Sequence, residues 1–370
     1  MKTKIRTISF YHHFSCLGAD CPQSCCHGWR IPVDLASVSR YDREPGILGI
    51  RAKLALSRRR TAPSFNRLSL GCPLHDPDGL CALQKKRGEK FLPETCRIYP
   101  REWANLGSFV ERTLDLSCVR AAEVFLEADT EDQWGLAFSE ETGLWEKPRA
   151  GDNDDSAFLT WLFEKREEIL KTLIGGAHRG PEDLDEQIFR LTADAKQAQS
   201  SYLRTTETFV QRIGMFPFSI MLLNELMSTS FFESHLRWSN PLLYRSCRRY
   251  YRLFDPLTEI EGQKRLDGMV ASFFAGNGPA GVREYMRYFA YCLLRSWFDS
   301  YEDYSFVRRI AEAAIHTNML LLFELLSAEH KEELSVRRRA LMISAYEKRA
   351  RHNDEVLAEM VGCVLKRIAC

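Results

Sequence analysis

The stretch CPQSCCHGWRIP, residues 21–32, holds three cysteines in its first six positions. Cys16 lies five residues before it, so four thiols fall within eleven residues of chain. Two of these thiols, Cys25 and Cys26, are adjacent. Such a cluster is typical of disulfide staples, of metal ligands or of redox nucleophiles. The rest of the sequence must distinguish between these three chemistries.

The overall composition is that of an ordinary globular chain. It has 370 residues, of which 45% are hydrophobic and 27% charged, which is enough for a sizeable core and predicts two domains. The net charge of +1 argues against a nucleic-acid-binding protein. We recognise neither an apolar stretch of roughly 18 residues nor a secretory signal, so we expect a cytoplasmic protein without a membrane partner. Cytoplasmic reductants keep most disulfides open.

The twelve cysteines are unevenly distributed, because eight of them lie before residue 119. That segment is too turn-rich for a core helix or strand, so metal binding is favoured over disulfides and over buried free thiols. The predicted metal ligands are Cys16, Cys21, Cys25, Cys26, Cys72, Cys81, Cys96 and Cys118. Their spacing is irregular and suits an iron–sulfur cluster better than zinc, which remains the alternative. The surplus thiols remain open to a second metal, redox exchange or packing.

Other single residues and runs carry weaker signals. Four histidines near the thiols are possible ligands, but a single histidine is more often structural: His12, His13, His27 and His75. The basic runs RRR at 58–60 and 337–339 are expected on solvated faces. Cys363 abuts the apolar stripe of the last helix and is expected to pack there. Cys247, Cys292 and Cys370 are isolated, and no metal role is expected for them.

The residue pattern changes near 149–158. Residues 1–130 are punctuated by Pro and Gly, and we expect one helix at 35–41 capped by Asp34 and a short strand within 108–118. Residues 150–370 have helical periodicity over 158–174, 285–298, 305–327 and 356–368. GNGPAG at 276–281 follows helical spacing, so it is predicted to be a helix–helix loop and not a dinucleotide site. The predicted fold is mainly α, with a small irregular α+β Cys-rich N-terminal metal domain followed by an all-α helical bundle.

Several of these stretches together resemble a known family. They are FSCLGADCPQSCCHGWRIPVD (14–34), CPLHDPDGLCALQKKRGEKFLPETCRIYPR (72–101) and LDLSC (114–118). Over about residues 10–120 they are similar to the flagellin lysine-N-methylase family and to a broader zinc- or iron-chelating Cys-rich domain. ISAYEKRARHN (343–353) looks like the helical tail of that family, although this match is looser.

The resemblance implies transfer of methyl groups from S-adenosylmethionine to flagellin lysines, with a [4Fe–4S] cluster proposed to participate. The run Cys16-x4-Cys21-x3-Cys25 departs from the Cys-x3-Cys-x2-Cys triad of radical S-adenosylmethionine enzymes, so radical chemistry is not inferred. The glycine-rich strand–loop–helix of an ordinary Rossmann methyltransferase is also absent from the sequence. A non-catalytic iron–sulfur or zinc module, serving as a redox sensor or docking protein, remains the alternative.

The reaction implied by the resemblance needs a neutral lysine amine. With a pKa of about 10.4, roughly one free lysine in 2,500 is neutral at pH 7. A base or a desolvating aromatic pocket must therefore favour the neutral form. The sequence identifies neither this base, nor the S-adenosylmethionine site, nor the oligomeric state. We expect flagellin to dock on the helical domain, at an open cleft beside the Cys-rich unit.

Overall fold

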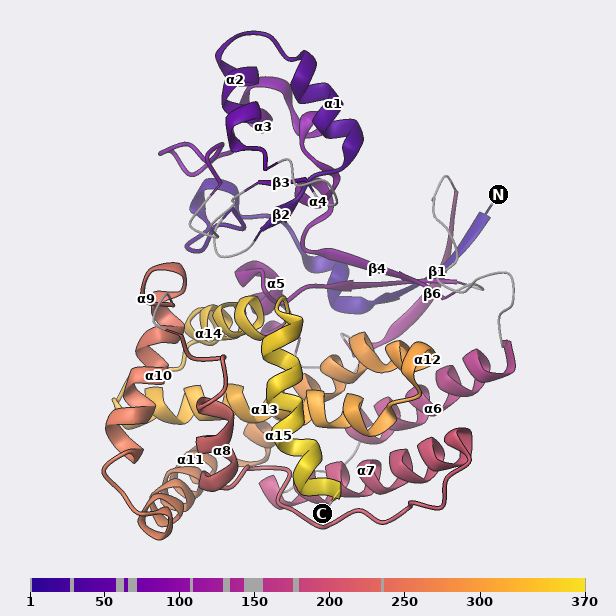
Figure 1. Cartoon of the computed structure of the whole chain (residues 1–370), viewed down its shortest axis with the longest axis vertical. Coiled ribbons are helices and arrows are strands. Elements are labelled where there is room, and N and C mark those ends of the chain that lie inside the picture. Colours follow the sequence, from indigo (N-terminus) through magenta and orange to yellow (C-terminus); the bar gives the residue numbers. More distant parts are fainter. Residues whose placement is uncertain are drawn as a thin grey trace.

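The computed structural model describes residues 2–26, 30–57, 63–65, 72–106, 109–128, 134–142, 156–175, 180–233 and 236–369. It has three parts that follow one another along its longest axis (Figure 1). At one end lies the cysteine-rich lobe, which we define as residues 16–98. A small sheet follows, and a group of helices forms the other end. His27, Trp29, Cys370 and the run at 58–60 lie outside the described residues.

The cysteine-rich lobe combines short helices with a two-stranded ribbon. Its core is a small cluster of buried apolar side chains that includes Tyr41, Phe65 and Leu74. Asp34 caps the first helix as predicted, because its Oδ1 accepts a hydrogen bond from the Ser37 amide at 2.7 Å. The elements of the lobe are η2 (Gly18–Asp20), β2 (Ile31–Pro32), α1 (Leu35–Arg43), α2 (Gly46–Ala55), β3 (Ser64–Phe65), α3 (Ala82–Arg87), η3 (Glu89–Phe91) and α4 (Glu94–Ile98).

The central sheet has the strand order β4-β5-β1-β6. Its strands are β1 (Lys2–Ile8), β4 (Arg101–Asn105), β5 (Val110–Leu114) and β6 (Leu136–Thr142). β1 and β5 are parallel, with Ile5 opposite Val110, and the other pairs are antiparallel. The strand predicted within 108–118 is therefore confirmed as β5. η1 (Ser9–His13) and α5 (Val119–Glu127) connect this sheet to its neighbours.

The remaining described chain is almost entirely helical, which confirms the mainly α fold class. Its elements are α6 (Ser156–Gly175), α7 (Pro181–Leu203), α8 (Ile220–Met227), α9 (Leu236–Ser239), α10 (Pro241–Phe254), α11 (Glu259–Ser296), η5 (Trp297–Asp299), α12 (Ser300–Asp303), α13 (Phe306–Glu329), α14 (Val336–Ala350) and α15 (Asp354–Ala369). The helices predicted at 158–174, 305–327 and 356–368 correspond to α6, α13 and α15.

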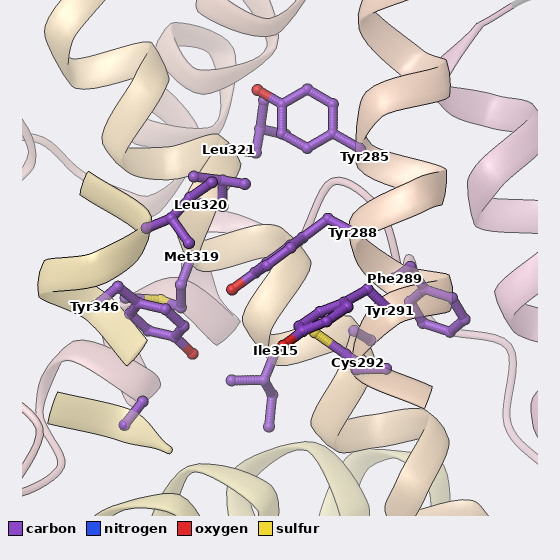
Figure 2. Close-up of a cluster of buried hydrophobic side chains, with 14 of the residues drawn as sticks. Tyr285, Tyr288, Phe289, Tyr291, Cys292, Ile315, Met319, Leu320, Leu321 and Tyr346 are labelled. Carbon is purple, nitrogen blue, oxygen red and sulfur yellow. The ribbon is translucent and has the colours of Figure 1, made fainter. Parts of the chain in front are cut away.

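Helix α13 is the centre of the helical part. It packs against α7, α10, α11, α14 and α15, and Figure 2 shows tyrosines of α11 beside its apolar residues. Tyr288 and Tyr291 of α11 stack with centroids 6.5 Å apart, and Ile315 of α13 lies next to Tyr291 in Figure 2. By length and composition α13 could cross a membrane, which the sequence analysis did not recognise. Its apolar window is wholly buried inside the structure, as in the core helix of a soluble protein.

Two predictions about local structure are wrong. The stretch 276–281 is not a loop, because α11 runs through it without a break. Leu266 and Met269 before the stretch and Val282 and Met286 after it are all buried, so packing overrides the local preference of Gly and Pro. The run 337–339 is not a solvated face either. Its arginines are half-buried and pair with Glu123, Glu332 and Glu324.

The main core joins the sheet to the helices. A single cluster of buried apolar residues extends from Ile8 and Phe10 through Leu114 to Ile368. β6 lies beyond residue 130 and pairs with β1 along its whole length. The division into domains 1–130 and 150–370 stays a prediction, and these contacts show that the sheet shares its interior with the helices.

Candidate functional site

The structure brings most of the predicted metal ligands, from the cysteine-rich lobe and from the start of α5, within electrostatic reach of one another. Cys25 and Cys26 lie in a turn, Cys81 caps α3, Cys96 lies in α4 and Cys118 caps α5. The described cysteines are all free thiols. Electrostatic interactions connect Cys26 with Cys72, Cys81 and Cys96, connect Cys25 with Cys96 and Cys118, and connect Cys118 with Cys21. Four distant stretches of sequence therefore bring their thiols together.

The adjacent side chains of Cys25 and Cys26 are hydrogen-bonded to each other. A hydrogen bond between the side chains lowers the pKa of Cys26 to about 6 and raises that of Cys25 well above its usual value. Burial raises the pKa of Cys72 to about 12 and that of Cys118 to about 11. Buried thiols crowded in this way repel each other once ionised, and a bound cation relieves that repulsion.

Two observations argue against a metal site that is already formed by these thiols. Cys16 is exposed, and its sulfur accepts a hydrogen bond from the Gly18 amide at 3.4 Å. Across the described ranges, no three His, Cys, Asp or Glu side chains form a ready-made metal-binding arrangement. The thiol chemistry fits an iron–sulfur cluster or zinc, whereas the side chains are not preorganised for either. Metal binding by the eight cysteines stays a prediction.

The histidines and the isolated cysteines lie in different parts of the structure. His75 forms a β-bridge to Cys81 and helps to lower the pKa of Cys26. His12 lies instead near Glu141 of the sheet. Cys247, Cys292 and Cys363 are buried in helices, as expected for packing residues.

A cleft of about 1140 Å³ separates the cysteine-rich lobe from the helices. The lobe contributes Cys21, Gln23 and His75, and α9, α10 and α14 contribute much of the opposite wall. The two walls touch at Ser344 of α14, whose hydroxyl lies 2.9 Å from Gln23 Oε1 and 2.6 Å from the Ser117 carbonyl oxygen. Among the clustered cysteines, Cys21 is therefore the one that lines the cleft.

A buried polar cluster lies behind the wall of this cleft. His352, which lines the cleft, contacts Asp115 Oδ2 at 2.9 Å through its Nε2. The Ser117 hydroxyl lies 3.2 Å from the same nitrogen and 2.9 Å from the Tyr99 hydroxyl. Arg295 of α11 lies 3.7 Å from Asp115 Oδ1. Three of the stretches quoted above, YPR, LDLSC and the helical tail, therefore meet at Ser117.

The charges in this cluster shift one another's protonation. Although burial opposes ionisation, the neighbouring Arg295 and His352 hold the pKa of Asp115 well below its usual value. Burial is the largest single influence on His352 and opposes its charged form, but the hydrogen bond and the negative charge of Asp115 together outweigh it and raise the pKa of His352. In the same wall, burial lowers the pKa of Lys348, against the opposing electrostatic effect of Cys25 and Cys118.

Sequence reasoning did not identify Asp115, Ser117, Lys348 or His352 as site residues. These four residues all lie in stretches that carried the resemblance. Their place in those stretches was the one sequence feature that could have pointed to them. Asp115 and His352 are separated by more than 200 positions along the chain. The packing of α14 against α5 brings their two stretches together.

Comparison with known proteins gives partial matches in sequence. No family model matches the chain, and no solved structure does. The lysine-N-methylase of Salmonella choleraesuis (strain SC-B67) is 30% identical over 141 residues, which is 36% of this chain and 34% of that protein. The lysine-N-methylase of Salmonella typhimurium (strain LT2) matches to the same extent. The chain thus spans about a third of the length of the lysine-N-methylases that it matches.

A shorter relative is covered more completely. The flagellar biosynthetic protein FliU of Salmonella muenchen is 32% identical over 117 residues, which is 30% of this chain and 69% of that protein. The lysine-N-methylases carry the family name that the cysteine-rich stretches led us to expect, and FliU is named as a flagellar protein. The chain therefore belongs to the flagellin lysine-N-methylase family.

Proposed function

We propose that this chain transfers methyl groups from S-adenosylmethionine to lysines of flagellin in the cytoplasm, and that its cysteine-rich lobe holds a [4Fe–4S] cluster. The observation that carries the proposal is the large cleft between the gathered thiols and the helices, with the His352–Asp115 pair in its wall. The names of the relatives support the reaction class, since two of them are lysine-N-methylases.

The cleft has the features that a lysine methylase needs. In a polar transfer, the lysine nitrogen gives up a proton and bonds to the methyl carbon while the carbon–sulfur bond of the donor breaks, which leaves S-adenosylhomocysteine. We propose His352 as the acceptor of that proton, because it lines the cleft and Asp115 stabilises its protonated form. The indole of Trp238 lines the same cleft, where the stem of a lysine can pack on it.

The thiols of the cysteine-rich lobe are the proposed ligands of the cluster. Cys25 interacts electrostatically with Cys26, Cys96 and Cys118, Cys26 interacts with Cys72, Cys81 and Cys96, and Cys118 interacts with Cys21. When bound, a cluster with one open iron supplies a Lewis-acidic anchor for the amino and carboxylate groups of the donor. Cys21 lines the cleft, and this supports the proposal of such an anchor near the lysine.

The test of the function is methyl transfer itself. We expect the anaerobically purified protein to add methyl groups to unmethylated flagellin from isotope-labelled S-adenosylmethionine. Mass spectrometry should find the label on lysines in increments of one methylene. A folded, metal-loaded preparation that leaves flagellin unlabelled would exclude this substrate and favour the non-catalytic alternative.

The metal content can be tested independently of activity. We expect iron and acid-labile sulfide in the anaerobic protein, and we expect both to fall in Cys26→Ser, because this thiol interacts with Cys25, Cys72, Cys81 and Cys96. Melting should also occur at lower temperature in that variant, since metal binding is coupled to folding. Cys363→Ser, in the buried stripe of α15, is the control and should keep its iron. Stoichiometric zinc without sulfide would contradict the cluster.

A further inference from the structure

One face of α10 is unusually basic. Arg245, Arg248, Arg249 and Arg252 are spaced at i, i+3, i+4 and i+7, which places them on the same side of the helix. Together with Arg237, Tyr244 and His330 they line a hollow of about 470 Å³. The chain as a whole has a net charge of only +1, so this concentration of arginine is local.

Most of these arginines keep their charge available to a ligand. Glu332 accepts two hydrogen bonds of 2.7 Å from Arg249 and also pairs with Arg338. The hydrogen bond from Arg249 lowers the pKa of Glu332 to about 2. This carboxylate is therefore already neutralised by two guanidinium groups. Arg248 and Arg252 are exposed, and within the described residues neither has an ion pair.

The basic face leads directly into the cleft proposed for methyl transfer. Arg245 lines both the hollow and the cleft. Beside it, Trp238 of α9 lines the cleft with 74% of its surface exposed, and the Arg237 guanidinium lies 5.1 Å from the centre of its ring. An exposed tryptophan flanked by arginines is a common composition for a binding surface.

We propose that this basic face docks an acidic segment of the protein substrate next to the lysine that enters the cleft. The inference rests on the proposed function for the identity of the group in the cleft. From Arg245 to Arg252 the helix rises about 10 Å, which an extended peptide covers with about three residues. A short acidic run flanking a lysine therefore fits this face, whereas a nucleic acid would need a longer basic track.

Binding of a defined peptide tests the proposal without any need for methyl transfer. The probe is a fluorescein-labelled peptide in which one lysine is flanked by glutamates, measured by anisotropy at low and moderate salt. We expect Arg248→Glu/Arg252→Glu to bind it about tenfold more weakly than the unmodified protein, because two attractions become repulsions. The matched control, Lys171→Glu/Lys264→Glu, makes the same charge change on exposed residues of α6 and α11 and should bind as the unmodified protein does.

The outcomes separate the docking face from the catalytic proposal. Equal binding of a peptide with glutamines in place of glutamates, or equal weakening in the control, would overturn the docking face. Displacement of the acidic peptide by a lower concentration of single-stranded DNA would overturn it in favour of a nucleic-acid ligand. Selective peptide binding by a protein that methylates nothing would support the face and count against the proposed function.

Discussion

Replacing Arg166 by methionine should destabilise the protein by roughly 3–5 kcal/mol, because the change leaves a buried carboxylate without its main partner. Arg166 is completely buried on α6 and binds both oxygens of Glu111 on β5, at 2.8 and 2.5 Å. It also donates to the Leu294 carbonyl of α11 at 2.9 Å. Arg6 approaches the same carboxylate at 3.3 Å but is shared with Glu167, so it compensates only in part.

A double variant separates the loss of the Arg166–Glu111 ion pair from the loss of side-chain volume. In Arg166→Met/Glu111→Leu both charges are removed and apolar atoms replace them, so most of the stability should return. Arg190→Met is the control, since Arg190 forms an exposed i,i+4 pair with Glu186 at 2.8 Å. Such pairs contribute about 0.3–0.5 kcal/mol. Urea unfolding of the unmodified protein, Arg166→Met, Glu111→Leu and the double variant gives the interaction energy as a double-mutant cycle.

The same experiment examines how the sheet and the helices depend on each other. Arg166 connects β5, α6 and α11 through its hydrogen bonds. If these parts form one cooperative unit, Arg166→Met should shift the whole unfolding transition, followed by fluorescence and by circular dichroism alike. A loss below about 1 kcal/mol would show that water or the neighbouring Arg6 replaces the missing partner.

Features with a local physical cause could be predicted from the sequence. The helix at α1 follows from one capping carboxylate, Asp34, and α13 follows from a periodic apolar pattern that burial then completes. The concentration of thiols in the first third of the chain predicted that they would gather, and Cys26 indeed has Cys72, Cys81 and Cys96 around it.

Features that depend on distant contacts could not be predicted in this way. Local rules placed a loop at 276–281, but the buried residues on either side continue one helical face across it. Arg337, Arg338 and Arg339 look solvated until their acidic partners are known. Nor does anything near Asp115 in sequence indicate that a histidine from the far end of the chain will pair with it.

We expect His352→Gln to lower methyl transfer at least about a hundredfold, because general bases contribute 10²–10⁴-fold. In the unmodified protein the rate should rise as pH increases through the pKa of His352, since only neutral imidazole accepts a proton. Although burial lowers that pKa, the hydrogen bond and the charge of Asp115 together raise it above its usual value. The rise should disappear in His352→Gln, which leaves only the titration of the substrate lysine itself.

Asp115→Asn distinguishes a base from a merely structural histidine. The substitution keeps the shape of the side chain but removes the charge that raises the pKa of His352, while Arg295 continues to lower it. The rise in rate should therefore move to lower pH, and the rate above neutral pH should fall far less than in His352→Gln. His12→Gln, beside Glu141 on the sheet, is the matched histidine control. If Asp115→Asn leaves the pH profile in place while urea unfolding shows an intact fold, then His352 only supports the wall of the cleft and another group must take the proton.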